Sequence, residues 1–126
     1  MGLIYTDLDL SNPVLKSIEK IKVKALVDTE AATLCIPEHI NIQLELEELE
    51  KREVTTADGK KHLVPYVGPV KISFKNRSCY TGAFVLGDEV LMGAVPMEDM
   101  DLVLIPLKQT VDVNPESPNI PSAIVK

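Results

Sequence analysis

The amino-acid sequence predicts an all-β fold, mainly strands with one or two short helices. Nine prolines and six glycines interrupt the 126 residues, and the apolar segments between them are too short for long helices. Asp58-Gly59 is a strong signal for a tight hairpin, because Asp and Gly both tolerate positive φ angles. Hydrophobic residues make up 45% of the chain and charged residues 25%, which is typical of a globular domain that holds a core.

Each element is predicted from its own local pattern. Residues 22–28 alternate at first and end in an apolar run, as in a strand that passes from the surface into the core. Pro37 can open a short helix with Ile40 and Leu44 on one face, and a second helix is expected over 96–100. Pro65 and Pro69 limit the return strand of the hairpin to an edge or a projecting position. The predicted strands cover 3–10, 22–28, 53–56, 62–66, 70–74, 80–86, 90–93 and 102–105.

The chain divides into a domain over 1–110 and a proline-rich tail over 111–126. Its net charge of −6 disfavours both a nucleic-acid backbone and an anionic membrane surface as partners. No apolar run approaches the roughly 20 residues of a membrane helix, and the first residues do not form a signal peptide. Cys35 and Cys79 stand among apolar neighbours, which is typical of buried thiols in a reduced, cytoplasmic protein. We expect no metal and no cofactor.

Asp28 is the residue that most needs an explanation. It ends the apolar run Ala25-Leu26-Val27, and a carboxylate in such a place usually has a partner or a function. Asp-Thr is also good turn chemistry, so Asp28 capping a turn remains an alternative.

Two short motifs resemble those of one known family. Leu26-Val27-Asp28-Thr29, followed by Ala31, resembles the Asp-Thr/Ser-Gly signature of retropepsin-like aspartic peptidases. Leu91-Met92-Gly93 resembles the apolar-apolar-Gly motif that runs beside the active loop in that family. Their separation, 93 − 28 = 65 residues, suits a compact member. Residues 96–102 resemble the end of small bacterial and cyanobacterial members, and the resemblance as a whole covers about 3–105.

The resemblance implies a closed acid-protease barrel with one lobe per chain. It also implies a homodimeric endopeptidase in which each subunit supplies Asp28, and the two carboxylates activate a water against an extended peptide. Thr29 would hydrogen-bond across the two-fold axis. The hairpin residues stand where the family carries the flap that covers the substrate: Ala57, Asp58, Gly59 and Lys60.

Glu30 departs from the resemblance, because the family has Gly directly after Asp-Thr. A Glu there could turn into solvent, favour substrates with basic side chains, or silence the enzyme. A silent dimer that binds a peptide or a protein partner is therefore the second hypothesis. A third is a small structural β protein in which Asp28 only caps a turn.

Overall fold

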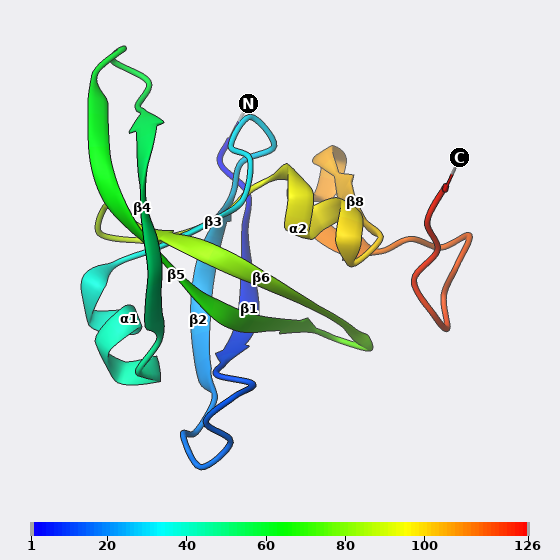
Figure 1. Ribbon diagram of the computed structural model, residues 1–126. Coiled ribbons are helices and arrows are strands. Elements are labelled where there is room, and N and C mark those ends of the chain that lie inside the picture. Colours follow the sequence, from blue (N-terminus) through cyan, green and yellow to red (C-terminus); the bar gives the residue numbers. More distant parts are fainter. Residues whose placement is uncertain (1, 126) are drawn as a thin grey trace.

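The computed structural model describes residues 2–125, which form a strand-rich body with two short α-helices (Figure 1). The mainly β fold with short helices is therefore confirmed. The elements are β1 (Tyr5–Ser11), β2 (Ile21–Val27), β3 (Leu34–Ile36), α1 (Glu38–Leu44), β4 (Glu47–Thr55), β5 (Lys61–Phe74), β6 (Arg77–Val85), β7 (Val90–Met92), α2 (Ala94–Asp99), β8 (Leu102–Ile105), the 3-10 helix η1 (Pro106–Lys108) and β9 (Thr110–Val113).

The main sheet closes on itself. Its strand order is β1-β2-β7-β3-β6-β5, and β1 also pairs with β5, so the ring has no free edge within these strands. β4 continues the sheet beyond β5 as the outer arm of a hairpin, while β8 and β9 form a separate two-stranded sheet. The closed barrel expected for a single retropepsin-like lobe is confirmed.

The core lies inside this ring, as the alternation of the strands requires. Leu8 and Leu10 of β1 are buried, and so are Val23 and Ala25 of β2. Met92 of β7 is fully buried among them. Each large apolar side chain removed from water in this way stabilises the fold by roughly 1.5–3 kcal/mol.

β5 differs from the prediction of two strands separated by prolines. It runs unbroken from Lys61 to Phe74 and contains both prolines. Pro65 lies opposite Lys51 in the part that projects with β4, and Pro69 falls in the register shift between Val67 and Val70. Both prolines therefore sit where a missing amide is tolerated, and the strand bends without ending.

Two short strands were not predicted. β3 has three residues and is followed at once by Pro37, so it is too short to show an alternating pattern. β9 begins at the boundary expected between the domain and the tail, and its Val111 is buried in the core. Residues 110–113 therefore belong to the folded body. α1 begins after Pro37 as predicted, with Ile40 and Leu44 buried. Neither α-helix in the described part of the chain has the length to cross a membrane.

Candidate active site

Asp28 lies directly after β2, where the barrel holds its backbone from one side. β7 runs parallel to β2, with Leu26 opposite Leu91. The amide of Asp28 donates to the carbonyl oxygen of Met92 at 3.0 Å, so the residue continues the ladder by one hydrogen bond. Its side chain is half-buried. The core strand thus delivers a carboxylate to the edge of the barrel without burying it.

The loop after Asp28 folds back on the carboxylate. The amide of Glu30 donates to Oδ1 of Asp28 at 3.0 Å, and the amide of Ala31 donates to the carbonyl oxygen of Asp28 at 3.1 Å. Within residues 2–125 the other carboxylate oxygen accepts no hydrogen bond. One oxygen therefore orients the side chain, and the second is available to another molecule.

Gly93 fits into this loop because it has no side chain. Its amide donates to the carbonyl oxygen of Thr33 at 2.9 Å, and the next amide, of Ala94, donates to that of Ala31 at 2.8 Å. A Cβ on Gly93 would lie 2.5 Å from the oxygen of Ala31 and 2.6 Å from that of Thr33, both backbone atoms. The structure thus brings Leu91, Met92 and Gly93 beside the loop that the sequence singled out.

Thr29 and Glu30 lie at the exposed side of the loop. The contact that residue 30 makes with Asp28 comes from its backbone, which Glu supplies as well as Gly does. The Glu30 side chain forms no hydrogen bond or ion pair with the described residues. The departure from the family motif therefore leaves the loop geometry intact and adds an unpaired negative charge beside Asp28.

Cys35 is a neighbour of the site that the sequence did not single out. Burial raises the pKa of its thiol, and the nearby carboxylate of Asp28 raises that pKa further. Cys35 pairs with Leu91 across β3 and β7, which places it next to the second motif. Its spacing in the sequence carried no signal of this contact, because the contact depends on β3.

The hairpin of β4 and β5 reaches the same end of the molecule as the Asp28 loop (Figure 1). Thr56 and Lys60 close its turn, with the Thr56 amide 2.9 Å from the Lys60 oxygen. Asp58 accepts from the Thr56 hydroxyl at 2.6 Å and from the Lys60 amide at 3.0 Å, and these bonds lower its pKa. Gly59 has φ +83 and is open to solvent, as a tight turn requires.

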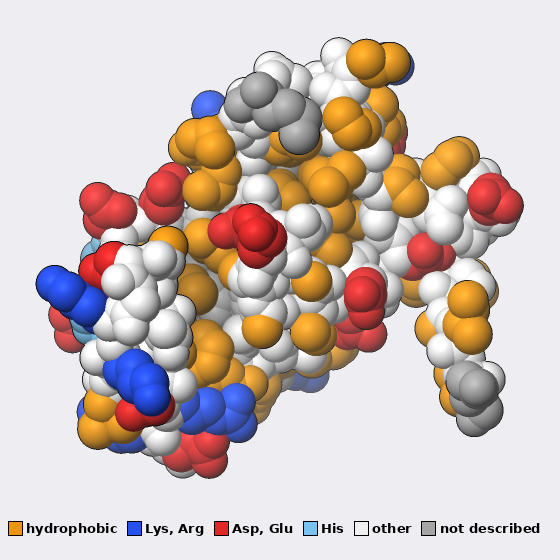
Figure 2. All heavy atoms as spheres, turned by 90° about the horizontal axis from the view of Figure 1, so that it is seen from above, with side chains coloured by type: hydrophobic (Ala, Val, Ile, Leu, Met, Phe, Trp, Pro, Cys, Tyr) orange, Lys and Arg blue, Asp and Glu red, His pale blue; other side chains and the backbone are white. Residues whose placement is uncertain are grey.

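The face that carries the loop is partly apolar. Figure 2 shows hydrophobic side chains gathered across the middle of this face, with acidic side chains among them. A hollow of about 370 Å³ lies beside Thr29, between α2 and β8. Apolar side chains line most of it, with Glu98 at its polar side. Nearby elements expose Val95, at 55%, and Leu107, at 100%.

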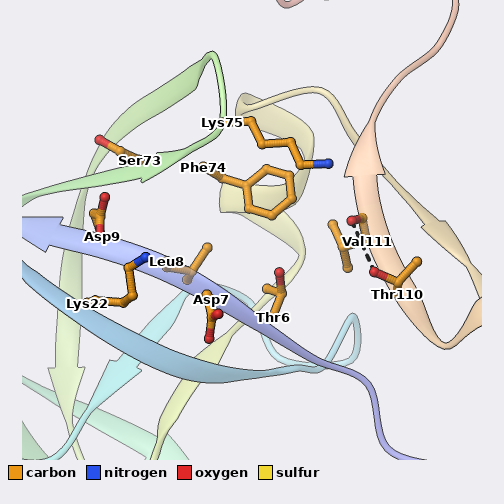
Figure 3. A pocket seen from close by; sticks show the side chains of 10 residues that line it. All are labelled: Thr6, Asp7, Leu8, Asp9, Lys22, Ser73, Phe74, Lys75, Thr110 and Val111. Atoms are coloured by element: carbon orange, nitrogen blue, oxygen red, sulfur yellow. Dashed lines mark hydrogen bonds between the residues drawn. The ribbon is translucent and has the colours of Figure 1, made fainter.

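A second hollow lies elsewhere and serves no evident chemistry. It has about 350 Å³ and lies between the ends of β1, β5 and β9 (Figure 3). Asp7, Asp9 and Lys22 line one side of it. Lys75 lines the other side, and its ammonium group donates at 2.7 Å to Asp112, which does not line the hollow. Nowhere in residues 2–125 do three His, Cys, Asp or Glu side chains gather as a metal site would require.

The comparisons with known proteins give a match among solved structures. No family model matches the chain, and no curated protein matches it by sequence. Among solved structures, the chain is similar to the protease of Simian Foamy Virus (mac), whose structure was determined in solution. The two share 18% sequence identity with a TM-score of 0.46, over 73% of this chain and 91% of the viral one.

Proposed function

We propose that two copies of this chain form an aspartic endopeptidase with one Asp28 from each subunit. The observation that carries the proposal is the Asp28 loop. The backbone of Asp28 is held by its amide bond to the Met92 carbonyl oxygen, and its carboxylate by the Glu30 amide. The other carboxylate oxygen accepts no bond from residues 2–125. Gly93 lets the backbone after β7 approach this loop closely, so the loop that carries Asp28 is packed against the barrel.

The chemistry follows from bringing two such carboxylates together. At a separation of roughly 3 Å, two carboxylates cannot both stay ionised, so the pair shares one proton. The charged partner takes a proton from a bound water, and the protonated partner donates to the carbonyl oxygen of the scissile peptide. A single chain has one such Asp, so this division of roles needs a second subunit.

The apolar end of the molecule supports a homodimer. Thr29 lines the hollow between α2 and β8, and a two-fold axis beside the loop would bring this surface against its own copy. Val95 and Leu107 would then be covered, which favours association. Such an interface is isologous, with the same residues contributed from both sides.

An extended peptide is the substrate that suits this arrangement. The exposed hairpin tip reaches the same end of the molecule as the loop, so the two can lie on opposite sides of a bound peptide. A peptide between them can pair its backbone with both, as an added strand does. The Ala57–Lys60 turn is then the flap, and its closure shields the carboxylates and their bound water from bulk solvent.

Cleavage of a peptide mixture between pH 4 and 7 tests the proposal. We expect Asp28→Asn to lose about 10³-fold in rate while keeping the dimer, because only the acid-base group is removed. When wild-type and Asp28→Asn chains are mixed equally, about one quarter of the dimers contain two wild-type chains if pairing is random. Activity should therefore fall to about one quarter of that of the same total amount of wild-type protein. Activity that falls only to one half would instead indicate independent subunits.

Glu30 favours a second candidate, a dimer that binds peptides without cutting them. Each subunit contributes one exposed Glu30, so a dimer has two additional negative charges beside the proposed pair of Asp28 carboxylates. These charges oppose ionisation of either carboxylate. Glu30→Gly separates the two candidates in the same assay. A large gain of cleavage indicates that Glu30 silences the wild-type chain, while an unchanged rate removes Glu30 as an obstacle. Glu30→Gln is the matched control for size.

A further inference from the structure

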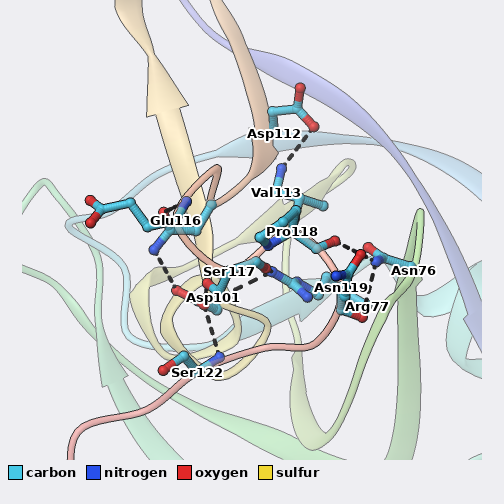
Figure 4. Close-up of polar contacts among 11 residues, drawn as sticks. Asn76, Arg77, Asp101, Asp112, Val113, Glu116, Ser117, Pro118, Asn119 and Ser122 are labelled. Atoms are coloured by element: carbon cyan, nitrogen blue, oxygen red, sulfur yellow. Dashed lines mark hydrogen bonds and ion pairs between the residues drawn. The ribbon is translucent and has the colours of Figure 1, made fainter.

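The segment that follows β9 is bound to the fold by side chains (Figure 4). Asp101, which lies two residues beyond the end of α2 and directly before β8, accepts three hydrogen bonds from it. They come from Asn114 Nδ2 at 3.1 Å, from the Ser122 amide at 2.9 Å and from the Ser117 hydroxyl. We call residues 114–122 the strap.

The other side of the strap is held by the turn between β5 and β6. Arg77 donates to the Ser117 carbonyl oxygen, and Asn76 Nδ2 donates to that of Pro118 at 2.9 Å. Arg77 is 2% exposed, and its guanidinium lies 3.9 Å from the Asp101 carboxylate. A buried guanidinium is costly unless charge and hydrogen bonds compensate for the lost water. Within residues 2–125 only Nη2 of Arg77 has a hydrogen-bond partner, while Nε and Nη1 have none, so the strap and Asp101 compensate this charge in part.

The strap binds Asp101, whose own amide donates to the Glu98 carbonyl oxygen in the last turn of α2 at 3.0 Å, and the Asp28 loop contacts the start of α2. At the loop end, the amides of Ala94 and Val95 donate to the carbonyl oxygens of Ala31 and Ala32 at 2.8 and 2.9 Å. The helix between these contacts has only six residues, Ala94–Asp99. A helix this short has little stability of its own and depends on what holds its ends.

We propose that Asp101 is a positioning residue for the Asp28 loop, acting through the strap and α2. By fixing the C-terminal end of α2, Asp101 keeps the amides of Ala94 and Val95 directed at the loop. It also fixes β8, which forms the wall of the hollow beside Thr29. The kinetic part of this inference rests on the proposed peptidase function, and the structural part does not.

Hydrogen exchange in the full-length chain tests the structural part. Asp101→Asn removes the negative charge that accepts the three hydrogen bonds of the strap. We expect the hydrogen-exchange rates of the Ala94 and Val95 amides, and those of the strap amides, to rise about tenfold. Asp112→Asn is the matched control. It removes an equal charge from a carboxylate that bonds to Lys75 outside the strap, and it should leave both amides unchanged. Faster exchange confined to residues 114–125 in Asp101→Asn would overturn the inference.

Enzyme kinetics test the second part of the inference, the effect of Asp101 on catalysis. If Asp101 positions the loop, Asp101→Asn lowers kcat about tenfold with little change in KM, because the peptide-binding surfaces remain. Ser117→Ala, which removes one hydrogen bond to Asp101, should give a smaller change in the same direction and serves if Asp101→Asn folds poorly. A change in KM alone would contradict positioning. If the wild-type chain cuts no peptide, the proposed function fails, and the exchange result still decides the role of the strap.

Discussion

Asp28 directly follows β2 and Asp101 directly precedes β8, and the chain uses the two acids in opposite ways. Asp28 accepts one hydrogen bond, from the Glu30 amide, and keeps its second oxygen free of the described residues. Asp101 accepts three hydrogen bonds and lies beside a buried guanidinium, which together lower its pKa to about 2. The Asp28 carboxylate is held by one backbone amide, whereas the Asp101 carboxylate is held by two side chains, a backbone amide and the nearby Arg77. An acid that is fully bonded serves structure, and one that is oriented but unsaturated is available for chemistry.

The largest expected effect is on the backbone that surrounds Asp28. Gly93→Ala should lower the free energy of unfolding by about 3 kcal/mol, because its Cβ would press on the backbone oxygens of Ala31 and Thr33. Denaturant unfolding measures this change. Gly59→Ala is the control, where open space leaves only the positive φ and costs about 1 kcal/mol. Equal losses for the two variants would mean that close approach at Gly93 is not what shapes the loop.

The two acids should also separate in thermal stability. Asp101→Asn should lower Tm by roughly 4 °C, because an amide replaces a charge that accepts three hydrogen bonds. Asp28→Asn should leave Tm within about 2 °C of wild type, since its Oδ1 still accepts from the Glu30 amide. Differential scanning calorimetry gives both values. A larger loss for Asp28→Asn would indicate that Asp28 has a structural role.

The strap should respond to acid in a defined window. The pKa of Asp101 falls from 3.8 to about 2 on folding, so its contribution is present above pH 3.8 and is lost as pH falls through 2. The chemical shift of the Ser122 amide should therefore stay constant from pH 6 to 4 and change between 4 and 2. In Asp101→Asn this transition should be absent. A transition near pH 4 would contradict the strong hydrogen bonding of this carboxylate.

The smallest expected effect concerns Cys35. Because the Asp28 carboxylate raises its pKa, Asp28→Asn should speed alkylation of Cys35 at pH 8 by about twofold. Cys79 is an internal control in the same chain. Burial raises its pKa to about 12, and Asp28 is not among the causes. Mass spectrometry of the two labelled peptides measures both rates, and equal acceleration at both thiols would point to general loosening.

The sequence predicts the local features of this fold better than the long-range ones. The turn at Asp58-Gly59, the helix after Pro37 and the apolar strand before Asp28 are visible because their signals lie within a few neighbouring residues. Only the resemblance places Gly93 beside the Asp28 loop, since nothing local to Gly93 indicates contact with the backbone of Ala31 and Thr33, 93 − 31 = 62 and 93 − 33 = 60 residues away. Arg77, Asp101 and Ser117 could not be paired from the sequence, because they come together only through the packing of separate elements.

β5 illustrates a different limit. Two prolines within five residues predict an interruption, yet the strand continues because one proline lies in the projecting hairpin and the other in a register shift. The sequence alone does not reveal which side of a strand will be paired. The prediction that prolines avoid regular positions in the middle of a sheet is therefore correct, and the prediction that the strand ends at them is wrong.

The close fit of Gly93 in the Asp28 loop has a consequence for the order of events during synthesis. Chain growth exposes Asp28 long before residues 91–95 leave the ribosome, and until then the loop lacks the amides and the carbonyl that hold it. Long-range pairing of this kind also forms slowly once the chain is complete. The loop therefore stays unorganised in every chain that still lacks residues 91–95, so a peptidase of the proposed kind would be inactive at that stage of its synthesis.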